Sequence, residues 1–523
     1  MAFADYFAKN LQSASSLLRG IDPEAFKELL AKESVAIAFD KNALTTAEGR
    51  KTLDLLTRLL ARLYPVLTYL GLDQPAKRAS KDLEGLAQAV NPNVDLKNSI
   101  EGVTGCIVVG ATSATGLPEA CKVLFAGSDN WLARLSTKKP VSSGSSPNPF
   151  GAGAAACFAV ANMFRKTFAA QLPNPKADED VTFSVLDMTV VKKRSRNPAW
   201  EAADLGEVFL VGCGAIGNGL LWAVRDFSGK GTLHVIDGEA LDMTNLQRYA
   251  MTLAKDEGAK TELAKKWLLS SGLRVEPHPQ CWEQYVSERE AWTFERLAVA
   301  VDTEVARIHI QASLPRIVHN SWTQLGHAGV SRHGFLGTGA CMACLYMPTQ
   351  AGFNLDQLVQ RALRLPDLML GEVRRRLDLG LPTELGFLQQ IASFGVIPIE
   401  QLLPFENKKL EELYYRGACG GEIVAVRDGE TARQIEVPMA FQSALAGILL
   451  AADVYAEVAK LRERLPTRTQ INLLTALPQL SPSDQVSKSV DSRCICVDPD
   501  FIEAYQERYS STFTQVKKPS KRP

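Results

Sequence analysis

Short apolar runs alternate with longer segments of helical periodicity along this chain of 523 residues. The runs at 208–211, 233–236 and 297–301 end at glycine or aspartate, which is typical of buried strands. A helix is expected after the glycine-rich turn at 212–217 and another from Lys260. Strands that alternate with helices predict an α/β fold of the Rossmann type.

The first 130 residues show a different pattern. Residues 1 to about 100 are rich in Leu, Ala, Lys and Glu at helical spacing, most clearly over 47–63, and predict a helical layer. The runs 106–110 and 122–129 then predict two short buried strands.

Three glycines lie between a predicted strand and a predicted helix. Gly212 and Gly214 permit a tight turn, and Gly217 lets the helix pack closely, so phosphates can meet free N–H groups at the helix N-terminus. Asp237 ends the next strand and suits a ribose hydroxyl pair. These features would equally describe a nicotinamide-binding domain.

Three further polar residues point to a triphosphate. Asn245, Arg248 and Lys260 can supply hydrogen-bond donors and positive charge, which a hydride-transfer site does not need. A Rossmann fold that binds no nucleotide is the alternative interpretation.

The segment from about 206 to 310 resembles the ThiF/MoeB/E1 adenylyltransferases, which use ATP to activate the C-terminal glycine of a ubiquitin-like protein. The residues that match the family pattern are Gly212, Gly214, Gly217, Asp237, Asn245, Arg248, Lys260 and Asp302. Tyr249 departs from the pattern, because the family often has glutamine there. The resemblance implies that ATP and Mg²⁺ bind here, with Mg²⁺ held by Asp302.

In this family a further arginine often enters from a partner half. Arg134 and Arg165 are conceivable sources, whereas Arg307 is expected to stay on the active half near Asp302.

Two helices rich in small residues echo each other, one predicted over 149–165 and one over 438–454. In the family such a helix packs at the back of each adenylation domain. We therefore interpret the first half as an inactive adenylation-like domain, since Gly110 to Gly116 has no accompanying Asn-Leu-x-Arg or lysine. A coincidence of composition is the alternative.

The interpretation gives a pseudo-dimer within one chain. Its predicted parts are an inactive adenylation-like domain with its helical layer (1–195), the first part of the active adenylation domain (196–348), a helical insertion with a catalytic-cysteine region (349–436), the closing part of the active domain (437–512) and a disordered tail (513–523).

Two tight cysteine pairs predict a structural zinc site. Cys341 and Cys344 have C-x-x-C spacing, and Cys494 and Cys496 follow far downstream. The family resemblance supports Zn²⁺, although its second pair is not usually C-x-C. Redox chemistry of the first pair or unligated thiols are the alternatives.

Cys419 is the thiol that we assign to thioester formation. Glycines flank it, Arg416 can lower its pKa, and it precedes the helix at 438–454 as the reactive cysteine does in the family. A buried or merely exposed cysteine is the alternative. The insertion before it, 349–416, suits a lid or a cysteine domain, or is a helical decoration without a catalytic part.

Composition narrows the setting of the protein. Lys and Arg together number 58, as do Asp and Glu, so global charge favours neither nucleic acid nor a membrane surface. The start lacks a secretion pattern, and the longest apolar candidate, 439–452, is too short to span a bilayer. Ten cysteines interpreted as thiols or metal ligands place the protein in the cytoplasm.

Four functions compete. The leading hypothesis is a bacterial E1-like enzyme that adenylates a ubiquitin-like protein with a C-terminal glycine and passes it through Cys419 to an E2-like protein. Resemblance to E1-like proteins of bacterial conjugation operons implies a role in antiphage defence. The alternatives are a sulfur-carrier adenylyltransferase of MoeB/ThiF type, a nicotinamide oxidoreductase and a non-catalytic scaffold.

Overall fold

The computed structural model describes Leu18 and residues 23–192, 195–289, 292–324, 326–347, 355–394, 397–414, 438–462, 467–479, 483–488 and 494–510. The chain divides into two compact units. The larger unit combines Met1–Met347 with Pro438–Pro523, and the smaller unit is Pro348–Val437.

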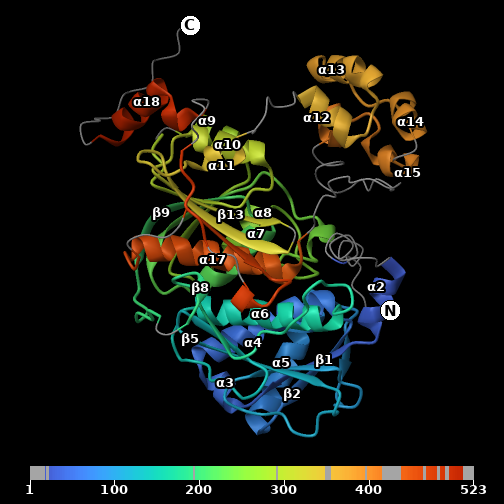
Figure 1. The fold of residues 1–523 in the computed structure, drawn as a ribbon. Coiled ribbons are helices and arrows are strands. Elements are labelled where there is room, and N and C mark those ends of the chain that lie inside the picture. The colour runs from blue at the N-terminus through green and yellow to red at the C-terminus, as the bar shows by residue number, and fades with distance from the viewer. Residues whose placement is uncertain are drawn as a thin grey trace. The chain divides into compact units, whose positions relative to one another are not determined.

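The first half of the larger unit is built on an eight-stranded sheet with the order β3-β2-β1-β4-β5-β6-β7-β8 (Figure 1). The strands from β3 to β5 are parallel, and β6, β7 and β8 are antiparallel to their neighbours. Its elements are α2 (Pro23–Ala31), β1 (Ser34–Phe39), α3 (Lys41–Thr45), α4 (Ala47–Leu63), β2 (Val66–Gly71), α5 (Gln74–Val90), β3 (Asp95–Lys97), β4 (Gly105–Val109), β5 (Lys122–Asp129), β6 (Leu132–Ser136), α6 (Phe150–Thr167), β7 (Val181–Ser184) and β8 (Thr189–Val190).

The second half is built on a seven-stranded sheet with the order β11-β10-β9-β12-β13-β14-β15. It is parallel from β11 to β13, and β14 and β15 are antiparallel to their neighbours. Its elements are β9 (Asp204–Val211), α7 (Ala215–Val224), β10 (Lys230–Ile236), η2 (Met243–Asn245), α8 (Lys260–Trp267), β11 (Arg274–His278), α9 (Trp282–Glu288), β12 (Arg296–Val299), α10 (Glu304–Ala312), β13 (Ile317–Gln324), β14 (His327–Gly334), α11 (Met342–Tyr346), α17 (Ala440–Val458), β15 (Arg468–Asn472), η6 (Leu477–Gln479), η7 (Ile495–Val497) and α18 (Pro499–Tyr509).

The two sheets repeat one strand order. In each sheet, the first strand in chain order lies between the second and the fourth, and the sixth strand is antiparallel to the fifth. A parallel core with this crossover order is the Rossmann type, so the predicted α/β fold is confirmed. Helices α6 and α17 have equivalent places in the chain, because each connects the sixth strand of its half to the seventh.

Local sequence explains where the helices of the first half begin. The hydroxyl of Thr46 accepts a hydrogen bond from the N–H of Gly49 at the start of α4, and Asp73 accepts from Ala76 at the start of α5. Helix α4 ends at Leu63, just before Pro65, because the residue preceding proline avoids helical geometry.

Helices α7 and α17 of the second half are in close backbone contact, and α6 of the first half packs against α17 (Figure 1). A Cβ built on Gly219 would lie 2.6 Å from the carbonyl oxygen of Ala444, and one on Gly447 would collide with the carbonyl oxygen of Ile216. A Cβ on Gly153 of α6 would lie 2.6 Å from the ring of Trp222. The small residues of these helices therefore allow one apolar core to run through both halves.

Two sequence expectations need correction. Residues 1 to about 100 are not a purely helical layer, because β1, β2 and β3 lie among the helices. The strands β1 and β2 are six-residue runs buried on both faces, so they lack the polar alternation that reveals a half-exposed strand.

Helix α17 is also longer than the apolar stretch predicted at 439–452. Its 19 residues are long and apolar enough to cross a membrane, but 89% of this apolar stretch is buried inside the protein. It is the central core helix of the second half.

The smaller unit is helical in its described part and has a hydrophobic core of its own, which includes Val359, Leu388 and Leu402. Its elements are α12 (Leu355–Ala362), η3 (Asp367–Met369), α13 (Leu370–Asp378), α14 (Leu385–Ser393), α15 (Ile399–Leu402), η4 (Leu403–Phe405) and α16 (Leu410–Glu412).

The contact between α7 and α17 predicts that Gly447→Ala is destabilising. The added methyl group must push two backbones apart, so we expect the free energy of unfolding to fall by about 2 kcal/mol in urea melts. Gly85→Ala is the matched control, because a Cβ on this helical glycine of α5 meets no atom within 4 Å. The control should gain about 0.5–1 kcal/mol. Equal stability of the two variants would contradict the packing argument.

Candidate functional site

The glycine turn between β9 and α7 forms the floor of the candidate site. Gly212 has φ +95°, and a Cβ there would lie 2.7 Å from the carbonyl oxygen of Ala300. A Cβ on Gly217 would lie 2.5 Å from the carbonyl oxygen of Gly212. Gly214 is the N-cap of α7 and makes no side-chain capping bond, so the N-terminal N–H groups of this helix can receive an anion.

Asp237 holds this turn at the carboxyl end of β10. Its carboxylate accepts hydrogen bonds from the N–H groups of Cys213, at 2.7 Å, and Glu239, at 2.9 Å. Burial raises the pKa of Asp237, and the nearby Lys260 ammonium opposes that rise. The side chain thus fixes the glycine turn, whatever it also binds.

Arg248 carries an unused hydrogen-bond donor. Its Nη2 donates to Asn245 Oδ1 at 3.1 Å, whereas its Nη1 is buried without a partner among the described residues. Burial lowers the pKa of Arg248, although Asp302 favours its charge. A buried guanidinium N–H without an acceptor is costly, so this position suits an anionic ligand.

Lys260 supplies the second positive charge at the start of α8. Its ammonium pairs with the exposed carboxylate of Glu239, and its side chain is 4% exposed. Burial opposes its charge, but Tyr249, Asp237 and Glu239 raise the pKa of Lys260 above its ordinary value. Lys260 therefore stays protonated at neutral pH.

The Tyr249 ring contacts both of these cations, a role that the sequence pattern did not predict. Its ring centre is 5.8 Å from the Arg248 guanidinium and 5.6 Å from Lys260 Nζ. A Cβ on Gly214 would lie 3.5 Å from its hydroxyl. The available sign of this role was its position directly after Arg248, where the sequence departs from the family pattern.

Asp302 follows β12 and is exposed. Arg307 steadies its segment by donating to the carbonyl oxygens of Val301 and Asp302, and its Nε donates to Asn320 at 3.0 Å. Arg307 thus remains on the second half, as predicted. The glycine turn, Asp237 and Asp302 all follow carboxyl ends of neighbouring parallel strands, where ligands of such sheets bind.

The corresponding edge of the first sheet is closed by its own carboxylates. Asp40, which follows β1, accepts from the N–H groups of Asn42 and Ala43. Asp73, which follows β2, accepts from Lys41 at 2.9 Å and from Ala76 at 2.9 Å. Asp73 thus binds this turn as Asp237 binds the glycine turn, but Asp40 in addition occupies N–H groups that a phosphate would need, so this edge opposes anion binding.

The four predicted cysteines come together in a cluster suited to a metal. Their sulfur atoms all lie within 4.8 Å of one another, with closest pairs at 3.4 Å between Cys344 and Cys494 and between Cys344 and Cys496. Tetrahedral Zn²⁺ with bonds of about 2.3 Å separates its sulfur ligands by about 3.8 Å. The donor set and its spacing therefore fit zinc.

The remaining predicted residues have other positions. Cys419 lies outside the described residues. Arg165 is 1% exposed, pairs with Asp178 at 2.7 Å and donates to the carbonyl oxygen of Leu473 at 2.7 Å, so its charge is already used. Arg134 pairs with Asp129 on β5.

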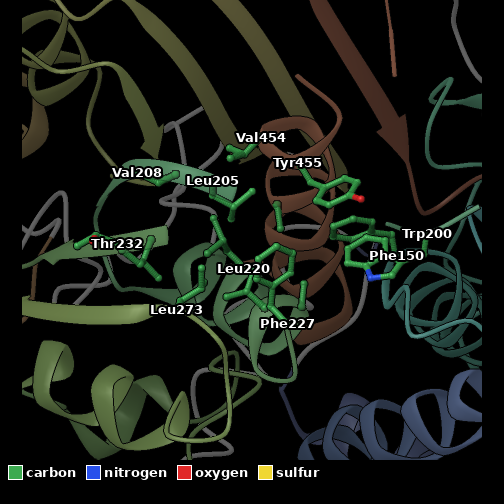
Figure 2. A pocket seen from close by; sticks show the side chains of 14 residues that line it. Phe150, Trp200, Leu205, Val208, Leu220, Phe227, Thr232, Leu273, Val454 and Tyr455 are labelled. Atoms are coloured by element: carbon green, nitrogen blue, oxygen red, sulfur yellow. The ribbon is translucent and has the colours of Figure 1, made fainter. Parts of the chain in front are cut away.

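A separate apolar cavity of about 20 Å³ lies between the second sheet and the helices α7 and α17. Its walls include Phe150, Trp200, Leu220 and Tyr455 (Figure 2). A space of this size holds about one water molecule and has almost no polar partner to offer, so it is a packing gap rather than a binding site.

Comparison with known proteins gives one partial match and several distant ones. Residues 38–169 match the family described as Prokaryotic E2 family C. A crystal structure of E. coli MccB with MccA-N7isoASN is 16% identical, covers 56% of this chain and 66% of its own, and has a TM-score of 0.34. A structure of PaaA is 20% identical, covers 28% and 44%, and has a TM-score of 0.20. Both structural resemblances are distant.

One relative matches over almost the whole length of both chains. The "Uncharacterized protein y4jF" of Sinorhizobium fredii (strain NBRC 101917 / NGR234) is 42% identical over 516 residues, which is 98% of each chain. The protein therefore belongs to the same family as y4jF.

Proposed function

We propose that this protein is an E1-like enzyme that uses ATP to adenylate the C-terminal glycine of a ubiquitin-like protein. The observation that carries the proposal is the buried, unpartnered Nη1 of Arg248 beside Lys260, at the edge where the N-terminus of α7 has no side-chain cap. The motif order that resembles ThiF/MoeB/E1 enzymes supports it.

The reaction proposed joins a carboxylate to the α-phosphorus of ATP. A carboxylate oxygen of the modifier attacks that phosphorus, the bond to the bridging oxygen breaks, and pyrophosphate leaves. The N–H groups at the start of α7 bind phosphate oxygens, while Arg248 and Lys260 stabilise the charge that grows on them. Lys260 exchanges the Glu239 carboxylate for phosphate in this step.

Asp302 is the residue that would hold Mg²⁺, because it is an exposed carboxylate at the same sheet edge. The ion would neutralise phosphate charge. Asp237 would bind the ribose through the part of its carboxylate that remains accessible.

Two alternatives differ from the leading proposal in distinct ways. A nicotinamide oxidoreductase needs no paired cations beside the phosphates, so Arg248 and Lys260 weigh against it. A MoeB/ThiF-type sulfur-carrier adenylyltransferase would share the adenylation step but would not transfer the modifier from a cysteine to an E2-like protein.

The second step proposed is a thioester on Cys419, formed as AMP leaves, before transfer to an E2-like partner. The match of 38–169 to a family described as Prokaryotic E2 favours a second candidate, in which the carrier thiol is in the same chain. Burial raises the pKa of Cys106 to about 12 and that of Cys157 further. Burial also raises the pKa of Cys121, but this thiol is only half-buried and is therefore the most accessible of that range.

The cellular setting is also part of the proposal. None of the nine described cysteines forms a disulfide, which suits a reducing cytoplasm. A role in antiphage defence rests only on the resemblance to E1-like proteins of bacterial conjugation operons.

Removal of either cation should abolish adenylation. We expect Arg248→Ala and Lys260→Ala to lower ATP–pyrophosphate exchange by about 100-fold or more, measured with ubiquitin-like proteins of the same genome that end in glycine. Arg274→Ala and Lys230→Ala are matched controls, because these exposed residues begin β11 and β10 at the opposite sheet edge. If the site variants retain the exchange rate of the controls, the adenylation site is wrong.

The cysteine cluster should bind one zinc ion per chain. We expect elemental analysis of freshly purified reduced protein to find that ion, and Cys341→Ser to lose it and to melt at a lower temperature. Cys281→Ser is the control, since Cys281 is exposed and lies outside the cluster. The zinc site would be disproved if the wild-type protein contained no metal and melted at the same temperature as Cys341→Ser.

Thioester capture distinguishes the two carrier thiols. With ATP and modifier, we expect an adduct that a reducing agent cleaves, lost in Cys419→Ala and retained in Cys121→Ala. The opposite pattern would favour the carrier within residues 38–169. An adduct that survives both substitutions would contradict both assignments.

A further inference from the structure

Two arginines of the first half bind the backbone of the segment that carries Arg248. Arg62 of α4 donates from Nε to the carbonyl oxygen of Leu246 at 2.8 Å and from Nη2 to that of Tyr249 at 2.6 Å, and it also reaches Thr252. Arg58, one turn earlier, donates from Nη1 to the carbonyl oxygens of Ala250 at 3.3 Å and Met251 at 3.1 Å. Five carbonyl groups between 246 and 252 thus point at two guanidinium groups.

These contacts are buried and specific. Arg62 is 1% exposed and Arg58 is 8% exposed. Arg58 is held in turn by Asp54, whose carboxylate accepts from its Nε at 3.1 Å and from the indole of Trp222 at 2.7 Å. A planar guanidinium can bind several carbonyl groups at once, and no smaller side chain could replace that arrangement.

The same segment is tied to the glycine turn from its other side. Asn218 of α7 accepts hydrogen bonds from Met251 N–H and from the Thr252 hydroxyl, both at 3.2 Å. The amide of Asn218 donates to the carbonyl oxygens of Cys213 at 3.2 Å and Gly214 at 3.1 Å. A continuous set of contacts therefore runs from α4 through the 246–252 segment to the turn.

We propose that Arg62 and Arg58 are positioning residues for the nucleotide site, through which the first half sets the place of Arg248 and Tyr249. The inference rests on the proposed function, because it concerns binding of ATP at that site. It gives the first half a catalytic purpose although its own sheet edge is closed by Asp40 and Asp73. Neither arginine needs to touch the nucleotide, because both act through the backbone of the 246–252 segment.

Another contact of α4 offers a control. Lys51 on the same helix pairs with Asp226 of the second half at 3.0 Å, and among the described residues it bonds to no member of the 246–252 segment. Lys51→Ala therefore breaks a bond between the halves and leaves the carbonyl groups bound. A purely structural role of α4 would make this variant resemble the arginine variants.

The experiment compares Arg62→Gln, Arg62→Lys and Lys51→Ala in the full chain, with ATP·Mg²⁺ as the probe in calorimetry and amide hydrogen exchange as a second readout. For Arg62→Gln we expect ATP affinity to fall at least tenfold and exchange to rise within 243–252, with partial recovery in Arg62→Lys. Lys51→Ala should match the wild type in both measurements. Arg58→Gln replaces Arg62→Gln if that variant does not fold.

The outcomes separate the inference from the proposed function. If wild-type protein does not bind ATP·Mg²⁺, the proposed function fails and the inference fails with it. If the wild type binds but folded Arg62→Gln keeps its affinity, the inference alone is overturned, whether or not hydrogen exchange rises. The same holds if Lys51→Ala loses as much affinity as Arg62→Gln.

Discussion

The structure of the larger unit depends on the close approach of α7 to α17. Gly219 and Gly447 let the two backbones meet without intervening side chains. The helix that begins at the glycine turn is thereby fixed against the core helix of its own half and, through Gly153 and Trp222, against α6 of the other half. A phosphate-binding turn needs such support, because its N–H groups must stay in place while the ligand changes charge.

Buried charge is arranged in two different ways in this protein. Burial opposes ionisation of Asp453, yet Arg332, Arg462 and His319 hold the pKa of its carboxyl far below its usual value, which pins α17 to β13 and β14. Arg165 and Asp178 form a similar buried ion pair, although Arg165 Nε has no partner among the described residues. Arg248 differs from these pairs, because its Nη2 bonds an uncharged amide oxygen, that of Asn245, and its Nη1 has no acceptor among the described residues. The ion-paired arginines hold the fold, and the arginine bonded to an amide lies at the candidate site.

The sequence predicted those features of the structure that depend on residues close together in the chain. The boundaries of α4 and β5 follow from periodicity and capping, and the strand ends of the parallel sheet bring the glycine turn close to Tyr249, whose ring contacts Arg248 and Lys260. The roles of Arg62 and Asp40 could not be predicted. The role of Arg62 depends on carbonyl groups far away in sequence that only the fold brings close, and that of Asp40 depends on its carboxylate accepting from N–H groups that a phosphate would otherwise bind. The strands among the first hundred residues were missed because two-sided burial removes their alternation.

The sulfur cluster has a consequence for the connectivity of the chain. Cys341 and Cys494 are 153 positions apart, and the smaller unit Pro348–Val437 lies entirely within the loop that they close. A metal bound there would cross-link the two ends of that loop and so reduce the conformational entropy of the unfolded chain. Changes of length within the helical unit, away from Cys419, would then leave the strands and α17 on either side of it held together.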